Sequence, residues 1–286
     1  MDADPVRALL VSNAMDTPAL SLRARAARAA WPLPLEIIFM VVLDLVYEGL
    51  RLLVAPHGQR VQSAFSSAHH IVSAEKFMHI AIESGVQQLT DSIPGGRFAT
   101  TWYYTLAYTP LFVAFFVVVW FRWRAHYAFL RNWFWTTHIL AVTVFWVAPL
   151  APPRFALNGV VDTTQHALRL GGALNWFQSL RNDYAAMPSL HIGQSFLFAC
   201  ALVLLTHRPG SRKYLWWLLP IWMAWVTMAT ANHYLLDGVG GIATVLIALW
   251  IVHALTGRDV LRPWQTISGS EPVDTLGDAP TSSQGQ

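Results

Sequence analysis

The sequence has little charge and almost no cysteine. Charged residues make up 12% of its 286 residues, whereas an average soluble domain has roughly 25%. Because Cys200 is the single cysteine, no disulfide can form within the chain. The formal net charge of +3 is too small to indicate nucleic acid binding. What the sequence does contain is 55% hydrophobic residues, which excludes a disordered chain and an ordinary soluble globule.

The hydrophobic residues are gathered in six runs, and crossing a bilayer takes about 20 helical residues. The runs cover residues 33–54, 100–121, 133–150, 188–206, 214–231 and 236–255. Lipid cannot satisfy backbone polar groups, so each run is predicted to be a helix. The predicted fold class is all-α: a polytopic integral membrane helix bundle with six transmembrane helices. We divide the chain into a cytoplasmic N-terminal arm (1–32), a six-span membrane domain (33–256) and a disordered cytoplasmic tail (257–286).

The basic residues predict how the spans are oriented. They gather in four segments: before the first run, between the second and third, between the fourth and fifth, and after the sixth. The segment between the second and third runs, for example, contains Arg122, Arg124 and Arg131. Basic flanks face the cytoplasm, so we expect a multi-pass protein of the cell membrane with both termini in the cytoplasm. Residues 55–99, 151–187 and 232–235 then lie on the outer face.

One outer segment has helical periodicity of its own. Apolar residues recur at helical spacing within residues 67–90: Ile71, Ala74, Met78, Ile82 and Val86. This spacing predicts one amphipathic helix on the outer membrane surface, which the SIPGG sequence at 92–96 ends. The helix has two open interpretations, a lid over a site or a brace along the membrane.

Polar residues mark three places near the outer ends of the spans, where ionisable groups are functional candidates. Arg154 follows the third run in APPR, and Ser189 and His191 open the fourth run in PSLH. HYLLD, which contains His233 and Asp237, leads into the sixth run. Two crossings separate the two histidines, so both return to the same side, where Arg154 also lies. His233 and Asp237 are spaced i, i+4 and share one helix face. The sequence therefore predicts one outer pocket.

The residue types in this pocket suit phosphate ester chemistry. One imidazole attacks phosphorus while a carboxylate holds its tautomer, and the second imidazole protonates the leaving oxygen. An arginine and backbone N–H groups stabilise the charge on the remaining oxygens. The first-turn N–H groups of the fourth run, together with Ser189, form a natural anion site. Neither a metal ion nor another cofactor is required by this scheme.

Here the motifs support a resemblance. PSLH at 188–191 and HYLLD at 233–237 resemble the type 2 phosphatidic acid phosphatase superfamily. YAAMPSLH and ATANHYLLD resemble more closely its inositol-phosphotransferase branch, which includes the fungal inositol phosphorylceramide synthase and many bacterial membrane proteins. The resemblance runs from about residue 65 to 255. It implies that His233 forms a phosphohistidine, that Asp237 orients His233, and that His191 acts as acid and then as base.

The sequence departs from the superfamily pattern at two positions. Leu190 stands where Gly is usual, and Thr227 stands where an arginine usually precedes the nucleophilic histidine. The first superfamily motif, a Lys and an Arg-Pro pair, has no clear copy. Arg154 is our candidate for the phosphate-binding arginine, and a snorkelling membrane anchor is the alternative. Ser189 is implied to bind phosphate or simply to cap its helix. Three further residues are candidate headgroup contacts: Tyr104, Tyr184 and Asn232.

The first run contains Asp44, Glu48 and Arg51 on one helix face. Two interpretations stay open for these residues. They form an ion pair that faces other helices, or they line the cavity that receives the headgroup of the lipid.

The predicted function is an integral membrane lipid phosphotransferase that transfers a phosphorylated, inositol-type headgroup from a phospholipid donor to a lipid or polyol hydroxyl. An alternative is a lipid phosphate phosphatase that hydrolyses phosphatidate or polyprenyl phosphates. A third is a metal-dependent membrane enzyme in which His191, His233 and Asp237 are ligands, and a fourth is a transporter. The active site is expected on the extracytoplasmic face, without a nucleic acid partner.

Overall fold

The computed structural model describes residues 32–164, 182–206 and 211–256. Within these ranges the chain forms helices and no β-strand, which confirms the all-α fold class. The predictions of a cytoplasmic N-terminal arm and a disordered tail fall on residues 1–31 and 257–286, which lie outside the described residues.

Each of the six apolar runs coincides with helical structure. The helices are α3 (Leu33–Leu53), α6 (Gly96–Trp102) continued by a π-helical turn (Tyr103–Ala107) and α7 (Tyr108–Arg122), then α8 (Arg124–Val147), α12 (Leu190–Leu205), α13 (Leu218–Ala229) and α14 (Leu235–Thr256). Among the described residues, the stretch Gly96–Arg122 and α14 are long and apolar enough to cross a membrane. Since α12 and α13 have only 16 and 12 residues, the six crossings stay a prediction.

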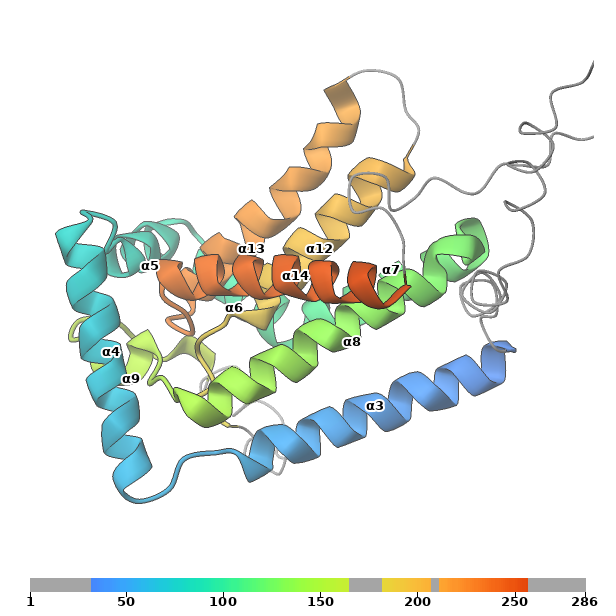
Figure 1. The fold of residues 1–286 in the computed structure, drawn as a ribbon. Helices are drawn as coiled ribbons and strands as arrows, with labels where there is room; N and C mark the ends of the chain where they lie inside the picture. The colour runs from blue at the N-terminus through green and yellow to red at the C-terminus, as the bar shows by residue number, and fades with distance from the viewer. Residues whose placement is uncertain (1–31, 165–181, 207–210, 257–286) are drawn as a thin grey trace, which may run out of the picture.

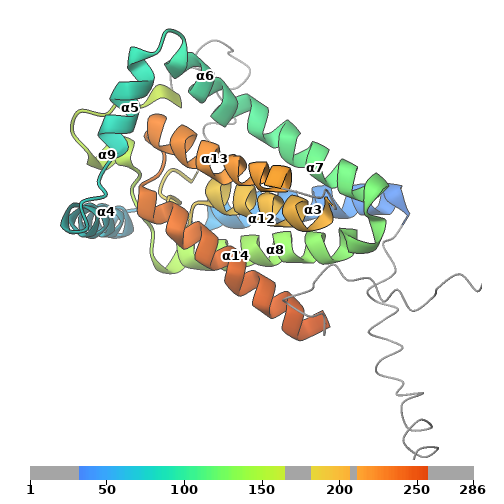
Figure 2. The ribbon, with the colours of Figure 1, turned by 90° about the horizontal axis from the view of Figure 1, so that it is seen from above.

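The helices are arranged as a bundle with one helix laid across its end. Figure 1 shows α3, α8 and α14 along the length of the molecule, with α4 (Gln59–Phe77) crossing one end. The short helices α5 (Glu83–Ser92) and α9 (Pro153–Ala156) lie at the same end. In the view from above, α12 runs through the middle, with α13 on one side and α8 and α14 on the other (Figure 2). Helix α3 lies beyond α8, on the outside of the bundle (Figure 1).

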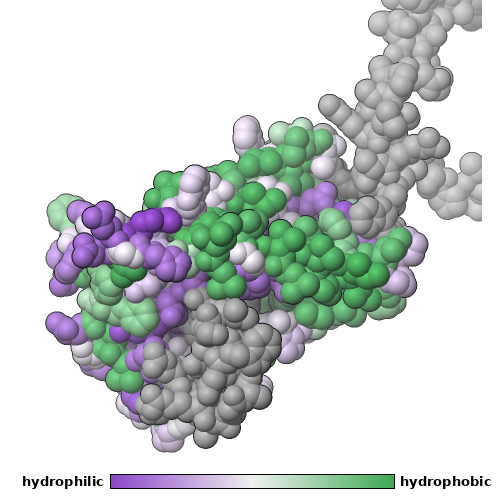
Figure 3. Space-filling view, turned by 90° about the horizontal axis from the view of Figure 1, so that it is seen from below, coloured by the Kyte–Doolittle hydropathy of each residue, from purple (hydrophilic) through white to green (hydrophobic). Residues whose placement is uncertain are grey.

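Aromatic side chains fill the core between the helices. Phe115 of α7 stacks on Phe198 of α12 with ring centroids 4.1 Å apart. The buried indole N–H of Trp133 donates to the carbonyl of Val245 at 2.8 Å, which joins α8 to α14. On the face shown in Figure 3, the body of the molecule is hydrophobic on the outside as well, whereas hydrophilic residues gather at the end where α4 lies. An apolar body with a polar end is the surface expected of a helix bundle held in lipid.

The prediction of one amphipathic helix over residues 67–90 is wrong, because the segment forms α4 and α5 with a turn between them. His79 takes a left-handed conformation with φ of 58°, and the N–H of Ile80 donates to the carbonyl of Glu75 at 2.9 Å. This reversal ends α4 and turns the chain back. The predicted end of the segment, at SIPGG, is confirmed because α5 finishes at Ser92.

Candidate active site

The site forms where α12 and α14 begin, and glycines allow these two helices to touch. A Cβ atom added to Gly241 would lie 2.3 Å from the carbonyl oxygen of Ser189, and one added to Gly193 would lie 2.9 Å from the carbonyl oxygen of Gly241. The backbones approach this closely only because both residues lack side chains. The N–H of Ser189 also donates to the carbonyl of Asp237 at 2.9 Å, which ties the two helix starts together.

The two predicted histidines meet at this junction. The ring centroids of His191 and His233 lie 5.8 Å apart. His191 is half-buried, and its ring stacks on Tyr104 at 4.5 Å and tilts against Tyr108 at 5.1 Å. Tyr104 belongs to the π-helical turn between α6 and α7. The candidate headgroup residue Tyr104 is therefore a direct neighbour of the candidate acid-base histidine.

His233 is fixed by polar contacts. Its side chain is buried, and its Nδ1 lies 2.8 Å from the carbonyl oxygen of Ala186. A carbonyl can only accept, so Nδ1 carries the proton and the lone pair is on Nε2. Burial lowers the pKa of His233 to about 3, and the nearby positive charge of Arg154 also lowers it. The ring is therefore neutral, as a nucleophile must be, at any pH near 7.

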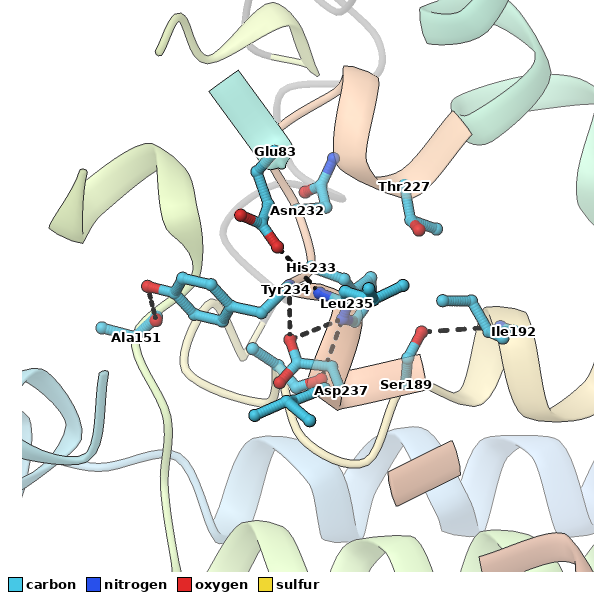
Figure 4. Close-up of polar contacts among 12 residues, drawn as sticks. Glu83, Ala151, Ser189, Ile192, Thr227, Asn232, His233, Tyr234, Leu235 and Asp237 are labelled. Atoms are coloured by element: carbon cyan, nitrogen blue, oxygen red, sulfur yellow. Dashed lines mark hydrogen bonds and ion pairs between the residues drawn. The ribbon is translucent and has the colours of Figure 1, made fainter. Parts of the chain in front are cut away.

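Asp237 lies close to the ring of His233, but it does not make the shortest contact to that ring, as a simple orienting carboxylate would. Its Oδ2 lies 3.4 Å from Nδ1 of His233 and accepts a hydrogen bond from the N–H of Tyr234 at 2.9 Å (Figure 4). The carbonyl of Ala186 makes the shorter contact to the ring. The predicted partner is thus near His233, but a backbone carbonyl shares its role, and such an acceptor has no signature in a sequence.

The turn that leads to His233 is held by Thr227, the residue that stands in place of the usual arginine. Its carbonyl accepts hydrogen bonds from the N–H groups of Asn232, at 3.0 Å, and His233, at 3.3 Å. Ala231 has a left-handed φ of 54° in this turn. Thr227 is completely buried, so this position contributes to the turn and offers no cation to a phosphate.

Arg154 lies beside this turn. Its backbone N–H donates to the carbonyl of Ala231 at 3.0 Å, and its guanidinium donates to Asn232 Oδ1. It forms ion pairs with Asp183 at 2.7 Å and Asp162 at 3.4 Å, and its side chain is only 4% exposed. This burial argues against an anchor that snorkels to the membrane edge. A phosphate would have to compete with two carboxylates for the guanidinium.

The remaining candidate residues, Ser189, Asn232 and Tyr184, have different contacts. Ser189 is completely buried, and its Oγ accepts from the N–H of Ile192, at 3.5 Å, as the cap of α12. Asn232 is buried and bonded to Arg154. Tyr184 packs against Phe65 and Phe155, with ring centroids about 6 Å away. Ser189 therefore caps its helix, a role that is compatible with the predicted contact to phosphate, and Tyr184 lies in an aromatic cluster.

Two of the three polar residues of α3 form the predicted ion pair. Arg51 pairs with Glu48 one turn before it, and its carbonyl accepts from Asn182 Nδ2 at 3.0 Å. Asp44 is exposed. The ion-pair interpretation holds for two of the three residues, and the end of α3 is joined to the segment that leads into PSLH.

Sequence reasoning missed two site residues, Glu75 of α4 and Glu83 of α5. Glu83 Oε1 accepts from the N–H of Leu235 (Figure 4) and Glu75 Oε1 accepts from the N–H of Leu236, both at 2.9 Å. The partners are 152 and 161 positions apart in the chain, so no local pattern links them. Their only signal is that a carboxylate interrupts the apolar spacing of residues 67–90.

Comparison with known proteins gives one match. The family model of the PAP2 superfamily matches residues 69–251, which include both histidines, Arg154 and Asp237. The chain belongs to the PAP2 superfamily. No curated protein and no solved structure gives a significant match. Membership in the PAP2 superfamily, together with the apolar helices, identifies a membrane enzyme of the phosphatase or phosphotransferase type. The described residues contain no group of three or more His, Cys, Asp or Glu placed to hold a metal ion.

Proposed function

We propose that this PAP2 superfamily member is an integral membrane lipid phosphotransferase that works through a phosphohistidine. The observation that carries the proposal is the pairing of His191 with His233 at 5.8 Å. The Nδ1 of His233 is held by the carbonyl of Ala186, which leaves the Nε2 lone pair for attack. The proposed substrate is an inositol-type phospholipid, in keeping with the resemblance of YAAMPSLH and ATANHYLLD to inositol phosphotransferases.

The first step forms the phosphohistidine. The Nε2 of His233 attacks the phosphorus of the donor lipid, a P–N bond forms, and the P–O bond to diacylglycerol breaks. His191 gives its proton to the leaving oxygen. The ring of His233 becomes positively charged, and the Ala186 carbonyl and the Asp237 carboxylate, at 2.8 and 3.4 Å from Nδ1, stabilise that charge.

The second step releases the headgroup to an acceptor. A lipid or polyol hydroxyl gives its proton to His191, its oxygen attacks phosphorus, and the P–N bond to His233 breaks. Arg154 is proposed to bind the phosphate oxygens after exchanging Asp183 or Asp162 for the substrate, with Asn232 and Tyr104 in contact with the headgroup. We further propose that the six helical segments all cross the membrane, with both termini in the cytoplasm and this site on the outer face.

Hydrolysis is the alternative outcome of the same chemistry, with water in place of the acceptor hydroxyl. It is favoured by one observation: His191 is half-buried, so the histidine that would activate water is accessible. Phosphatidate or a polyprenyl phosphate would then be the substrate.

The test uses the purified full-length protein in liposomes. Phosphatidylinositol labelled in its headgroup is offered with ceramide or a soluble polyol, with and without a chelator. A new labelled lipid or polyol indicates transfer, and free inositol phosphate indicates hydrolysis. Activity that disappears on chelation would support a metal enzyme. The proposal is wrong if no phospholipid is consumed, or if His233→Ala retains the activity.

A further inference from the structure

The first turn of α14 is held by carboxylates from three different helices. The N–H groups of Tyr234, Leu235 and Leu236 donate to Asp237, Glu83 and Glu75, each at 2.9 Å. These are the N–H groups that a helix start leaves without internal partners. Because all three are occupied, they are not available to a phosphate. The residue immediately before this turn is His233, the proposed nucleophile.

The carboxyl groups of Glu75 and Glu83 form a buried pair. The two residues are 0% and 2% exposed, and their carboxyl groups interact with each other. Glu75 Oε2 is buried, and in the described part of the chain no donor is bonded to it. Burial raises the pKa of Glu75 to about 8, and the negative charges of Glu83 and Asp237 add to that effect. At neutral pH Glu75 therefore holds a proton, which it can donate to Glu83.

We propose that Glu75 and Glu83 are positioning residues of the phosphotransfer reaction, which hold the first turn of α14 and thereby the ring of His233 against His191. This inference rests on the proposed function. The N–H of His233 reaches the carbonyl of Thr227 at 3.3 Å, and the backbone bonds that follow it, from Leu235 and Leu236 to the two carboxyl groups, are shorter, at 2.9 Å. A displacement of about 1 Å at a reacting group costs on the order of 10²-fold in rate.

The test compares variants of the full-length protein in liposomes. We expect Glu75→Ala and Glu83→Ala to lower kcat by about 10²-fold while the KM for the donor lipid changes little, because both side chains are buried and accept from backbone N–H groups. Glu75→Gln keeps most of the activity, since its amide oxygen still accepts from Leu236 and its NH₂ group donates to Glu83. The matched control is Gln87→Ala, a buried polar side chain of α5 whose bonds go to Val161 and Ala229.

A pH profile distinguishes positioning from a merely structural cap. In the wild type, Glu75 loses its proton as pH rises through about 8, the two carboxylates repel each other, and kcat falls. In Glu75→Gln this fall of kcat at alkaline pH, the alkaline limb of the profile, is absent. The other titratable groups at this place are Glu83, Asp237, His233 and Tyr234, and all of them are present in both proteins.

Three results would overturn the inference. They are wild-type kcat in both alanine variants, an equal loss of kcat in Gln87→Ala, and an alkaline limb that is the same in Glu75→Gln as in the wild type. If the alanine variants do not fold, the dependence of kcat on pH in Glu75→Gln is the deciding measurement for the inference. Activity retained by His233→Ala would instead refute the proposed function itself.

Discussion

The starts of α12 and α14 carry the two histidines, which differ in burial and in their ring contacts. His191 follows a single serine cap, is half-buried, and lies against the faces of Tyr104 and Tyr108. His233 is 5% exposed, and hydrogen bonds fix both its ring and the helix turn that follows. The bond to the Ala186 carbonyl fixes one tautomer of His233. The difference in exposure agrees with the proposed roles, which are attack for His233 and proton transfer for His191.

The strongest test of this comparison removes each histidine in turn. His233→Ala abolishes turnover, and His191→Ala lowers it by about 10²- to 10⁴-fold, the usual contribution of acid-base catalysis. A donor with a nitrophenol leaving group needs no proton on that oxygen. We therefore expect it to restore formation of the phosphohistidine in His191→Ala and not in His233→Ala, measured as a burst of nitrophenol and as acid-labile label on the protein.

The assignment of roles would be wrong if the nitrophenyl donor restored both variants equally. It would also be wrong if either variant kept activity within tenfold of the wild type with the natural donor. Thermal unfolding in detergent is the control that both variants are folded.

The second test moves the two helix starts apart. Gly241→Ala places a Cβ 2.3 Å from the backbone oxygen of Ser189, which cannot yield without separating α12 from α14. We expect the free energy of unfolding to fall by about 1–3 kcal/mol, as for other overpacked contacts. We also expect turnover to be lost as the histidines separate. Gly240→Ala is the matched control, because its Cβ meets mainly the flexible side chain of Met187. Equal melting temperatures and equal activities of the two variants would show that the close approach is unimportant.

The third and smallest effect concerns the cation beside His233. Arg154→Ala is expected to lower kcat/KM by about 10- to 100-fold, the range for losing a charge-assisted hydrogen bond. Arg154→Lys does not restore it, because an ammonium group cannot reach Asp183 and Asn232 at once. Steady-state kinetics with the donor lipid measure the change. An unchanged KM and kcat in Arg154→Ala would leave Arg154 with a structural role only.

The sequence predicts the parts of this site that depend on local pattern. The run at 236–255 gives α14, which spans Leu235–Thr256, and counting crossings brings His191 and His233 to one side. The contact of the Ala186 carbonyl with His233 could not be predicted, because every residue has a backbone carbonyl and the sequence does not show which one meets the ring. Nor could the turn at residues 78–82, whose apolar spacing continues that of a helix. On either side of that turn, Glu75 and Glu83 accept hydrogen bonds from α14, at residues 161 and 152 positions further along the chain, and no local pattern indicates such a partner.

The distance along the chain between Glu83 and its partner has a consequence for biosynthesis. The ribosome makes the carboxyl group of Glu83 152 residues before the amide of Leu235 that it binds. Helix α14 is therefore made after both carboxyl groups, and its first turn supplies the N–H groups that they accept. Under the proposed function, a nascent chain in which α14 has not yet docked cannot hold His233 against His191, so reactivity toward lipids starts only once this contact has formed.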